Sequence, residues 1–226
     1  MHIPDGFLSP EVAGATAVAG AAAVGYGLKK ANAIDERRVP LLGVTGAFIF
    51  AAQMLNFPVA GGTSGHFLGA ALAAILLGPW LACLTMAVVL GLQAFVFADG
   101  GITALGANVL NMGVIGALVV GGLMLASRRT LPKSRALLLG ITGIGAWLAV
   151  MAGATATSIE LALSGTVPLH TVLPAMLGVH AFIALGEAVI TVAAVSAVLA
   201  ARPDLISISD LADEELAAPA PALKGA

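Results

Sequence analysis

The sequence predicts an all-α integral membrane protein with seven transmembrane helices. Three observations lead to this prediction. Only 10% of the 226 residues are charged, against about 25% in a typical soluble domain, and the mean hydropathy is +1.03. Apolar segments follow one another along most of the chain. The Lys and Arg residues fall into three groups that can all lie on one side of a membrane.

Each predicted helix corresponds to one apolar segment, since about 20 apolar residues cross the hydrocarbon core. The segments are roughly 9–28, 39–57, 66–78, 79–98, 104–127, 135–163 and 171–201. Ser9 is expected to cap the first helix, with Pro10 at its first position and Glu11 in its first turn. Pro79 is expected to begin the fourth helix. The third segment is short, which predicts a helix half-buried behind its neighbours.

The basic residues predict the orientation. With seven helices, all of them fall in the first connection, the fifth connection and the C-terminal tail, at positions 29, 30, 37, 38, 128, 129, 133, 135, 202 and 224. The positive-inside rule makes that side cytoplasmic. The N-terminus and the loops 57–66, 98–103 and 164–171 are then expected outside. The acidic, Ala- and Pro-rich segment 202–226 predicts a disordered cytoplasmic tail after a membrane domain over 1–201.

Composition also excludes some functions. The formal charge of −2 predicts no nucleic-acid partner. The single Cys83 lies in an apolar run, so a disulfide or a thiolate metal cluster within one chain is excluded. The chain has no Walker P-loop and no repeat with a period of 20–50 residues.

The amino terminus is the segment with the clearest chemistry. It begins Met1-His2-Ile3-Pro4-Asp5-Gly6-Phe7-Leu8, without the basic stretch that opens a signal peptide. The Met1 amine, the His2 amide and the His2 imidazole can close a five-membered and a six-membered chelate ring on one metal ion. One more nitrogen would complete a planar set of four, the geometry typical of Ni(II) or Cu(II). Because a large second residue should prevent removal of the initiator methionine, we expect the free amine to belong to Met1.

His66 is the best candidate for the fourth nitrogen. It follows the glycine-rich loop Gly61-Gly62-Thr63-Ser64-Gly65, on the same predicted side of the membrane as the N-terminus. Pro4-Asp5-Gly6 is a turn signal that, with the rigid start of the first helix, would aim the terminus back at the protein. The competing interpretation is an incidental terminal histidine and a helix-capping or hydrogen-bonded loop histidine at position 66.

Polar residues near the outer helix ends are expected to orient these ligands. They are Thr63, Ser64, Asn56, Asp99 and Asn108. Thr63 and Ser64 serve equally well as caps of the third helix, and the others equally well in helix–helix hydrogen bonds.

His180 and Glu187 lie on one face of the last predicted helix. A buried His–Glu bridge or a subunit-docking role explains them as well as metal handling does, so we place both outside the predicted site.

Several of these segments resemble the CbiM/NikM family, the substrate-capture subunits of energy-coupling-factor transporters for cobalt and nickel. The resemblance covers about residues 1–200 and rests on the N-terminal octapeptide and on Leu55-Asn56-Phe57-Pro58-Val59, Gly62-Thr63-Ser64-Gly65-His66, Ala98-Asp99-Gly100-Gly101 and Gly106-Ala107-Asn108. It implies an extra N-terminal helix before a six-helix core. It also implies that Met1, His2 and His66, all intact here, bind transported Ni(II) or Co(II), with no prosthetic group.

The resemblance further implies partners and a location. A membrane coupling subunit and two cytoplasmic ATPases would drive uptake, often with a small accessory membrane subunit, in the cytoplasmic membrane of a bacterium or archaeon. The chain itself would then not be an enzyme, in agreement with the missing P-loop. Gly43, Ala47 and Ala51 resemble the small-residue face through which such subunits meet the coupling protein, although internal packing explains the spacing equally well.

Two other functions stay open from the sequence. One is a membrane metalloenzyme with His66, His180 and Glu187 as ligands, although no His-Glu-x-x-His motif occurs. The other is a stand-alone channel or secondary transporter, which would need an internal repeat or a polar path across the bilayer. The choice between nickel and cobalt is not encoded in any motif that we identify.

Overall fold

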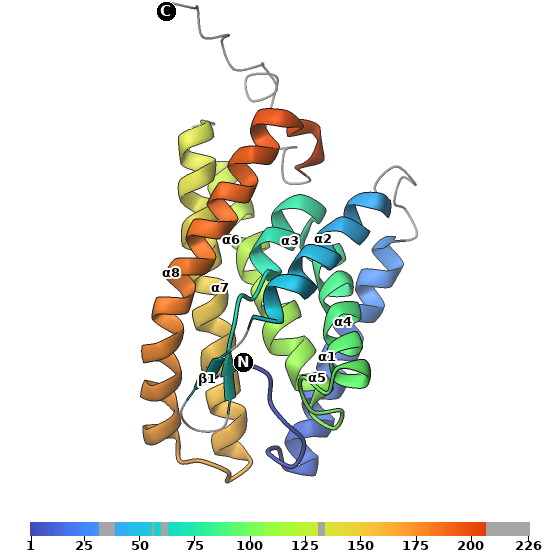
Figure 1. Ribbon diagram of the computed structural model, residues 1–226, viewed down its shortest axis with the longest axis vertical. Helices are drawn as coiled ribbons and strands as arrows, with labels where there is room; N and C mark the ends of the chain where they lie inside the picture. Colours follow the sequence, from blue (N-terminus) through green and yellow to red (C-terminus); the bar gives the residue numbers. More distant parts are fainter. Residues whose placement is uncertain (32–38, 56, 60–62, 131–133, 207–226) are drawn as a thin grey trace, which may run out of the picture.

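The computed structural model describes residues 1–31, 39–55, 57–59, 63–130 and 134–206. Its helices are α1 (Pro10–Ala31), α2 (Val39–Gln53), α3 (Ala70–Leu77), α4 (Pro79–Val96), α5 (Leu105–Asn108), η2 (Val109–Ile115), α6 (Gly116–Thr130), α7 (Arg135–Leu163), α8 (Leu169–Ala201) and the short η3 (Pro203–Leu205). The helices α5, η2 and α6 follow without a break, and η2 is a π-helix. The described residues therefore form the seven predicted helices (Figure 1).

Five of these helices are long and apolar enough to cross a membrane. They are Pro10–Ala31, Pro79–Val96, Leu105–Ser127, Arg135–Leu163 and Leu169–Ala201. The apolar α2 has 15 residues and is shorter than a full span. The protein is thus an all-helical, multi-pass membrane protein, and the predicted orientation stays a prediction.

The short helix α3 lies inside the bundle. All eight of its residues are buried, so the predicted half-burial was an underestimate. Eight residues rise only about 12 Å, too little to cross the hydrocarbon core. Figure 1 shows α3 between α6, α7 and α8 on one side and α1, α2 and α4 on the other. A helix enclosed in this way can end at membrane depth because protein, rather than lipid, surrounds its ends.

The predicted starts of the first and fourth helices are confirmed, whereas α3 and α8 begin at Ala70 and Leu169 rather than at 66 and 171. Helix α1 begins at Pro10, and the Ser9 hydroxyl accepts a hydrogen bond from the Val12 amide at 3.4 Å. Helix α4 begins at Pro79, directly after Gly78. Both prolines occupy positions where the helix needs no amide donor.

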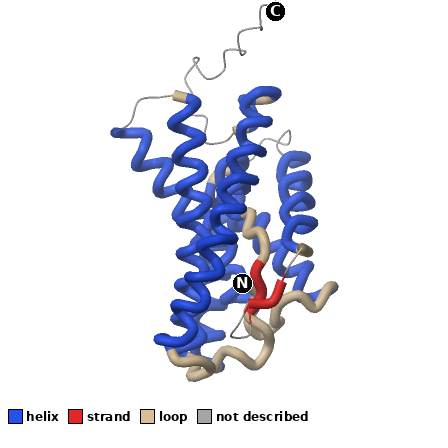
Figure 2. Tube along the Cα trace, turned by 60° about the vertical axis from the view of Figure 1, so that its left-hand side comes forward, coloured by secondary structure: helices blue, strands red, loops and turns tan. Residues whose placement is uncertain are grey.

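One element was not predicted. The region expected as a loop over 57–66 contains two antiparallel strands, β1 (Phe57–Val59) and β2 (Thr63–Gly65). Strands of three residues are too short to show the apolar–polar alternation by which strands are recognised. They lie beside the start of the chain in Figure 2 and lead into the segment that carries His66.

Close packing of α1 against the start of α5 depends on glycine. A Cβ atom on Gly106 would collide with the backbone of Ala17, and one on Gly20 would lie 3.0 Å from the Gly106 carbonyl oxygen. Small residues allow such backbone approach between helices in lipid. This contact holds the middle of α1 against α5, and the N-terminal segment before α1 then lies near the loop that leads into α5.

The C-terminal tail is only partly described. Within it, η3 follows α8, and Arg202 forms an ion pair with Asp204. Residues 207–226 lie outside the described part of the chain. The division into a membrane domain over 1–201 and a disordered tail over 202–226 therefore stays a prediction.

Candidate metal-capture site

The structure brings the three predicted ligand residues together inside the bundle. The Met1 nitrogen lies 3.0 Å from Nε2 of His66, although 65 positions separate the two residues in sequence. The rings of His2 and His66 lie edge to face with centroids 4.7 Å apart. Exposed fractions are 3% for Met1, 5% for His2 and 4% for His66. The start of the chain is therefore a buried part of the fold (Figure 1).

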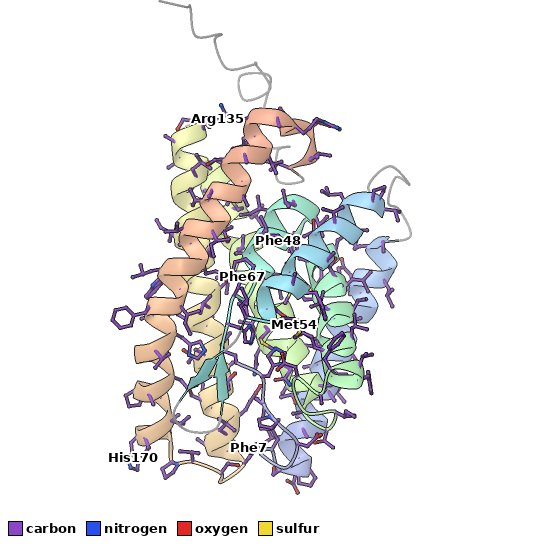
Figure 3. All side chains as sticks on the ribbon, in the orientation of Figure 1. Phe7, Phe48, Met54, Phe67, Arg135 and His170 are labelled. Carbon is purple, nitrogen blue, oxygen red and sulfur yellow. The ribbon has the colours of Figure 1, made fainter. Side chains whose placement is uncertain are left out.

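A short segment with no helical structure carries His66. It follows β2 and precedes α3, and in Figure 3 the adjacent Phe67 lies in the middle of the molecule. Phe7, by contrast, lies at the end where α1 begins. The first residues thus run from that end into the bundle to reach His66.

Hydrogen bonds define which nitrogen of each imidazole carries a proton. Nδ1 of His66 lies 2.7 Å from the Phe67 carbonyl oxygen, and a carbonyl can only accept, so Nδ1–H donates and Nε2 keeps its lone pair. Nδ1 of His2 donates in the same way to the Asp99 carbonyl at 3.0 Å. Its Nε2 is buried and has no hydrogen-bond partner among the described residues. Each ring therefore has one nitrogen free of hydrogen.

The predicted six-membered chelate ring requires Nδ1 of His2. In this structure that atom faces Asp99, so chelation would require the imidazole to turn about its Cβ–Cγ bond and release the Asp99 carbonyl. The ring also packs on Gly100, where an added Cβ would lie 2.8 Å from Nδ1.

The N-terminal segment is fixed by hydrogen bonds to α5 and to the loop that precedes it. The Ile3 amide donates to Oδ1 of Asn108 at 2.8 Å, and Nδ2 of Asn108 donates back to the Ile3 carbonyl at 3.1 Å. The Gly101 amide donates to the same carbonyl at 2.9 Å. Oδ1 of Asp5 accepts from the amide and the hydroxyl of Thr103 at 2.7 and 2.5 Å. These bonds position the first two residues beside His66.

Burial keeps the site free of positive charge. Loss of hydration lowers the pKa of the Met1 amine from 8.0 to about 4, despite the nearby Asp99 carboxylate, which raises it. Burial, and then repulsion by the amine, lower the pKa of His2 to about 3. Burial is also the main reason why the pKa of His66 falls well below 6.5. At neutral pH the site presents an amine and two imidazoles without their extra protons, the forms that bind metal ions.

Two of the predicted orienting residues lie at the site, and three are not described there. Asp99 contacts His2 through its carbonyl, with its carboxylate Oδ1 3.7 Å from Nδ1 of His2, and Asn108 holds Ile3. Asn56 lies outside the described residues. The backbones of Thr63 and Ser64 belong to β2, but their side chains lie outside the described part of the structure. The roles predicted for these three residues stay predictions.

Sequence reasoning left out His180 and Glu187, and both lie in the bundle interior. Nδ1 of His180 donates to the Met176 carbonyl at 2.8 Å. Glu187 accepts from the amides of Leu68 and Gly69 at 2.7 Å each, just after His66. An ionisable residue in an apolar helix was the one available signal, but its partners 118 and 119 positions away could not be read from the sequence. The predicted alternative of a His–Glu bridge is not what these hydrogen bonds form.

The metalloenzyme alternative gains no support from the side chains. Among the described residues, no group of three or more His, Cys, Asp or Glu side chains is arranged to hold a metal ion. Both carboxylate oxygens of Glu187 already accept backbone hydrogen bonds. A metal ion at Met1, His2 and His66 would therefore need main-chain nitrogens among its ligands.

Comparison with known proteins points to a family of metal-uptake components. A family model described as "Cobalt uptake substrate-specific transmembrane region" matches residues 2–205. The chain is 43% identical over 208 residues to a putative fused nickel transport protein NikMN of Archaeoglobus fulgidus, covering 91% of this chain and 68% of the relative. It is 42% identical over 209 residues to a putative metal transport protein of Haloquadratum walsbyi, covering 91% and 93%.

A solved structure confirms the fold. The crystal structure of a truncated transition metal transporter superposes with a TM-score of 0.80 at 36% identity, covering 88% of this chain and 98% of that one. The resemblance inferred from the N-terminal and loop motifs is thus confirmed, and the family is one of transport components rather than of enzymes. The chain belongs to the CbiM family, the substrate-specific transmembrane components of cobalt and nickel uptake transporters.

Proposed function

We propose that this protein captures Ni(II) or Co(II) from the outer side of the membrane with four nitrogens: the Met1 amine, the His2 amide, the His2 ring and Nε2 of His66. The observation that supports this most is the 3.0 Å separation between the Met1 nitrogen and Nε2 of His66. Two ligands at about 2.0 Å from a metal, on neighbouring corners of a square, lie about 2.8 Å apart. In this structure the two nitrogens already have nearly this spacing.

The connectivity of the chelate supports the same arrangement. The amine, the amide and the ring of one N-terminal dipeptide occupy three successive corners of a plane, because each adjacent pair closes a small ring. The fourth corner then neighbours both the amine and the His2 ring. His66 contacts both of these groups, since its ring lies against His2 and its Nε2 against the Met1 nitrogen.

Binding replaces protons with metal. The amine and the two imidazoles are neutral before the metal arrives, given their lowered pKa values. The His2 amide must lose its proton to become a ligand, and strong binding by Ni(II) favours this step; Co(II) is weaker in the same series. Both metals accept nitrogen ligands; the matching family is described by cobalt uptake, and the relative from Archaeoglobus fulgidus by nickel transport.

Transport would require partner subunits. We propose a membrane coupling subunit, two cytoplasmic ABC-type ATPases and a small accessory membrane subunit, in the cytoplasmic membrane of a bacterium or archaeon. The relative from Archaeoglobus fulgidus is described as a fused nickel transport protein, which supports association with a further subunit. On α2, Gly43, Ala47 and Ala51 are all exposed, which favours docking of a partner helix over internal packing.

Metal analysis tests the capture site directly. The full chain, purified with an untagged N-terminus, is expected to bind about one Ni(II) or Co(II) ion, and His2→Ala and His66→Ala are each expected to retain only weak residual binding. His170→Ala is the matched control, because this histidine is exposed near the start of α8 (Figure 3). Equal metal content in all four proteins would contradict the proposal. Uptake into vesicles that contain this protein alone would instead favour a secondary transporter.

A further inference from the structure

The segment between His66 and α3 is held at two of its peptide groups. Glu187 lies on α8 with 2% of its surface exposed. Its two carboxylate oxygens accept separate hydrogen bonds of 2.7 Å, Oε2 from the Leu68 amide and Oε1 from the Gly69 amide. On the opposite side of the same segment, Nε2 of Gln53 in α2 donates to the Leu68 carbonyl at 2.6 Å. Residues 68 and 69 are thus fixed between α2 and α8.

The backbone at Gly69 leaves little freedom for a different path. Gly69 has φ +83° and directly precedes α3. A Cβ atom there would lie 2.8 Å from two carbons of Ile49. The segment therefore enters α3 through a conformation and a space that favour glycine.

This fixation extends to the His66 ring. Nδ1 of His66 donates to the carbonyl of Phe67, the residue just before Leu68, whose backbone is hydrogen-bonded to Glu187 and Gln53. When residues 67–69 are held, the orientation of the imidazole is held as well, with Nε2 aimed at the Met1 nitrogen. Metal sites depend on such supporting contacts, and their removal typically lowers metal affinity about 10- to 100-fold.

We propose that Glu187 is a positioning residue for metal capture: by binding the Leu68 and Gly69 amides, it fixes the loop that presents Nε2 of His66 to the N-terminal amine. This inference rests on the proposed function of the site. It assigns to α8 a role in setting the geometry of the site, with no direct contact between Glu187 and the metal. Gln53 contributes from α2 by holding the Leu68 carbonyl.

The substitution Glu187→Gln tests this role with little change in volume. A carboxamide offers one acceptor oxygen, and its NH₂ group would face one of the two amide donors. We expect Ni(II) affinity to fall about 10- to 100-fold and the visible absorption of the bound Ni(II) to change, because the ligand plane would be distorted. Gln53→Met is the second variant, expected to lower affinity in the same direction.

Thr191→Val is the matched control. Thr191 lies four residues farther along α8, is fully buried, and its hydroxyl has no hydrogen-bond partner among the described residues. This variant should keep the affinity and the spectrum of the unaltered protein. Elution volume and thermal unfolding report which of the variants fold.

A double-mutant cycle separates positioning from general destabilisation. If Glu187 acts through His66, Glu187→Gln should have no further effect on the residual Ni(II) binding of His66→Ala. Additive losses would assign Glu187 a purely structural role and overturn the inference. So would a folded Glu187→Gln with unaltered affinity and spectrum, or, if that variant does not fold, a Gln53→Met protein that binds Ni(II) normally. If the unaltered protein binds no Ni(II) or Co(II), the proposed function itself fails.

Discussion

Asn108 pairs with Ile3 through both ends of its side-chain amide. Oδ1 accepts from the Ile3 amide and Nδ2 donates to the Ile3 carbonyl, 105 positions away in sequence. A neighbouring β-strand would make the same two hydrogen bonds to the backbone of Ile3. The Asn108 side chain thereby fixes the residue that follows His2. A helix residue thus sets how far the N-terminus reaches into the bundle.

Asn108→Asp should disturb this pairing with almost no change in shape. A carboxylate can accept from the Ile3 amide, but it has no donor for the carbonyl, and a buried unpaired group costs about 1–3 kcal/mol. We expect Ni(II) affinity to fall about 10-fold, since 1.4 kcal/mol corresponds to one factor of ten. Titration of the purified variant measures this, and an unchanged affinity would show that the Asn108–Ile3 pair does not control the site.

Gly101→Ala should displace the terminus by steric overlap. An added Cβ would collide with the backbone of Pro4 and Asp5, which cannot move without breaking the Asp5–Thr103 hydrogen bonds. Overpacking of this kind costs about 1–3 kcal/mol, so metal affinity should fall about 10-fold or more. Gly91→Ala on α4, where the Cβ meets nothing within 4 Å, is the matched control. Equal affinities in the two variants would contradict the observed path of residues 3–5.

Docking of the N-terminus, meaning burial of the Met1 amine beside His66, should weaken as pH falls. The Met1 amine has a pKa of about 4 when buried and 8.0 when free, so between these values the undocked state binds more protons. Docking is then fully favoured above pH 8 and is lost progressively toward pH 4. His2, with a pKa lowered from 6.5 to about 3, adds to the loss below pH 6.5. Hydrogen-exchange protection of the Ile3 amide should therefore decrease from pH 8 to pH 5.5, and equal protection factors would contradict a buried amine.

Metal binding above pH 8 should release about one proton, from the His2 amide. The amine and both imidazoles are already neutral in the docked state, so they contribute none. Calorimetric titrations of Ni(II) in buffers with different ionisation enthalpies measure the number released. A value near zero would exclude the amide as a ligand, and a value near two would mean that another group enters the site protonated.

The candidate metal-binding residues and most of the helices could be predicted from the sequence. The chelating capacity of Met1 and His2 is local, and the basic residues predict that the N-terminus and His66 share one side of the membrane. The apolar run 135–163 coincides with the observed α7, and 171–201 differs from α8 only at its start. Helix ends with strong proline and serine signals were likewise correct.

The supporting contacts were not predictable because they join distant residues through backbone groups. Neither the Asn108–Ile3 pair nor the Glu187–Leu68 bond leaves a pattern of period or spacing in the sequence. The hairpin of β1 and β2 was missed because its strands are too short to alternate. Burial of α3 depends on how the neighbouring helices pack around it, which composition alone does not specify.

The most direct test adds two alanines before Met1. They would convert the Met1 amine into an amide and place the new amine two residues away, about 7 Å along the chain. A single added residue would be unsuitable, because its amine, two amides and the His2 ring would themselves form a planar set of four nitrogens. The Met1 side chain packs against Gly153, where an added Cβ would lie 3.2 Å from its Cε. Little room is therefore left for the N-terminal segment to shift and compensate. Metal bound per protein, measured after dialysis, should fall from about one ion to near zero while elution volume and thermal unfolding stay unchanged. Full metal content in the extended protein would contradict capture by the N-terminal amine.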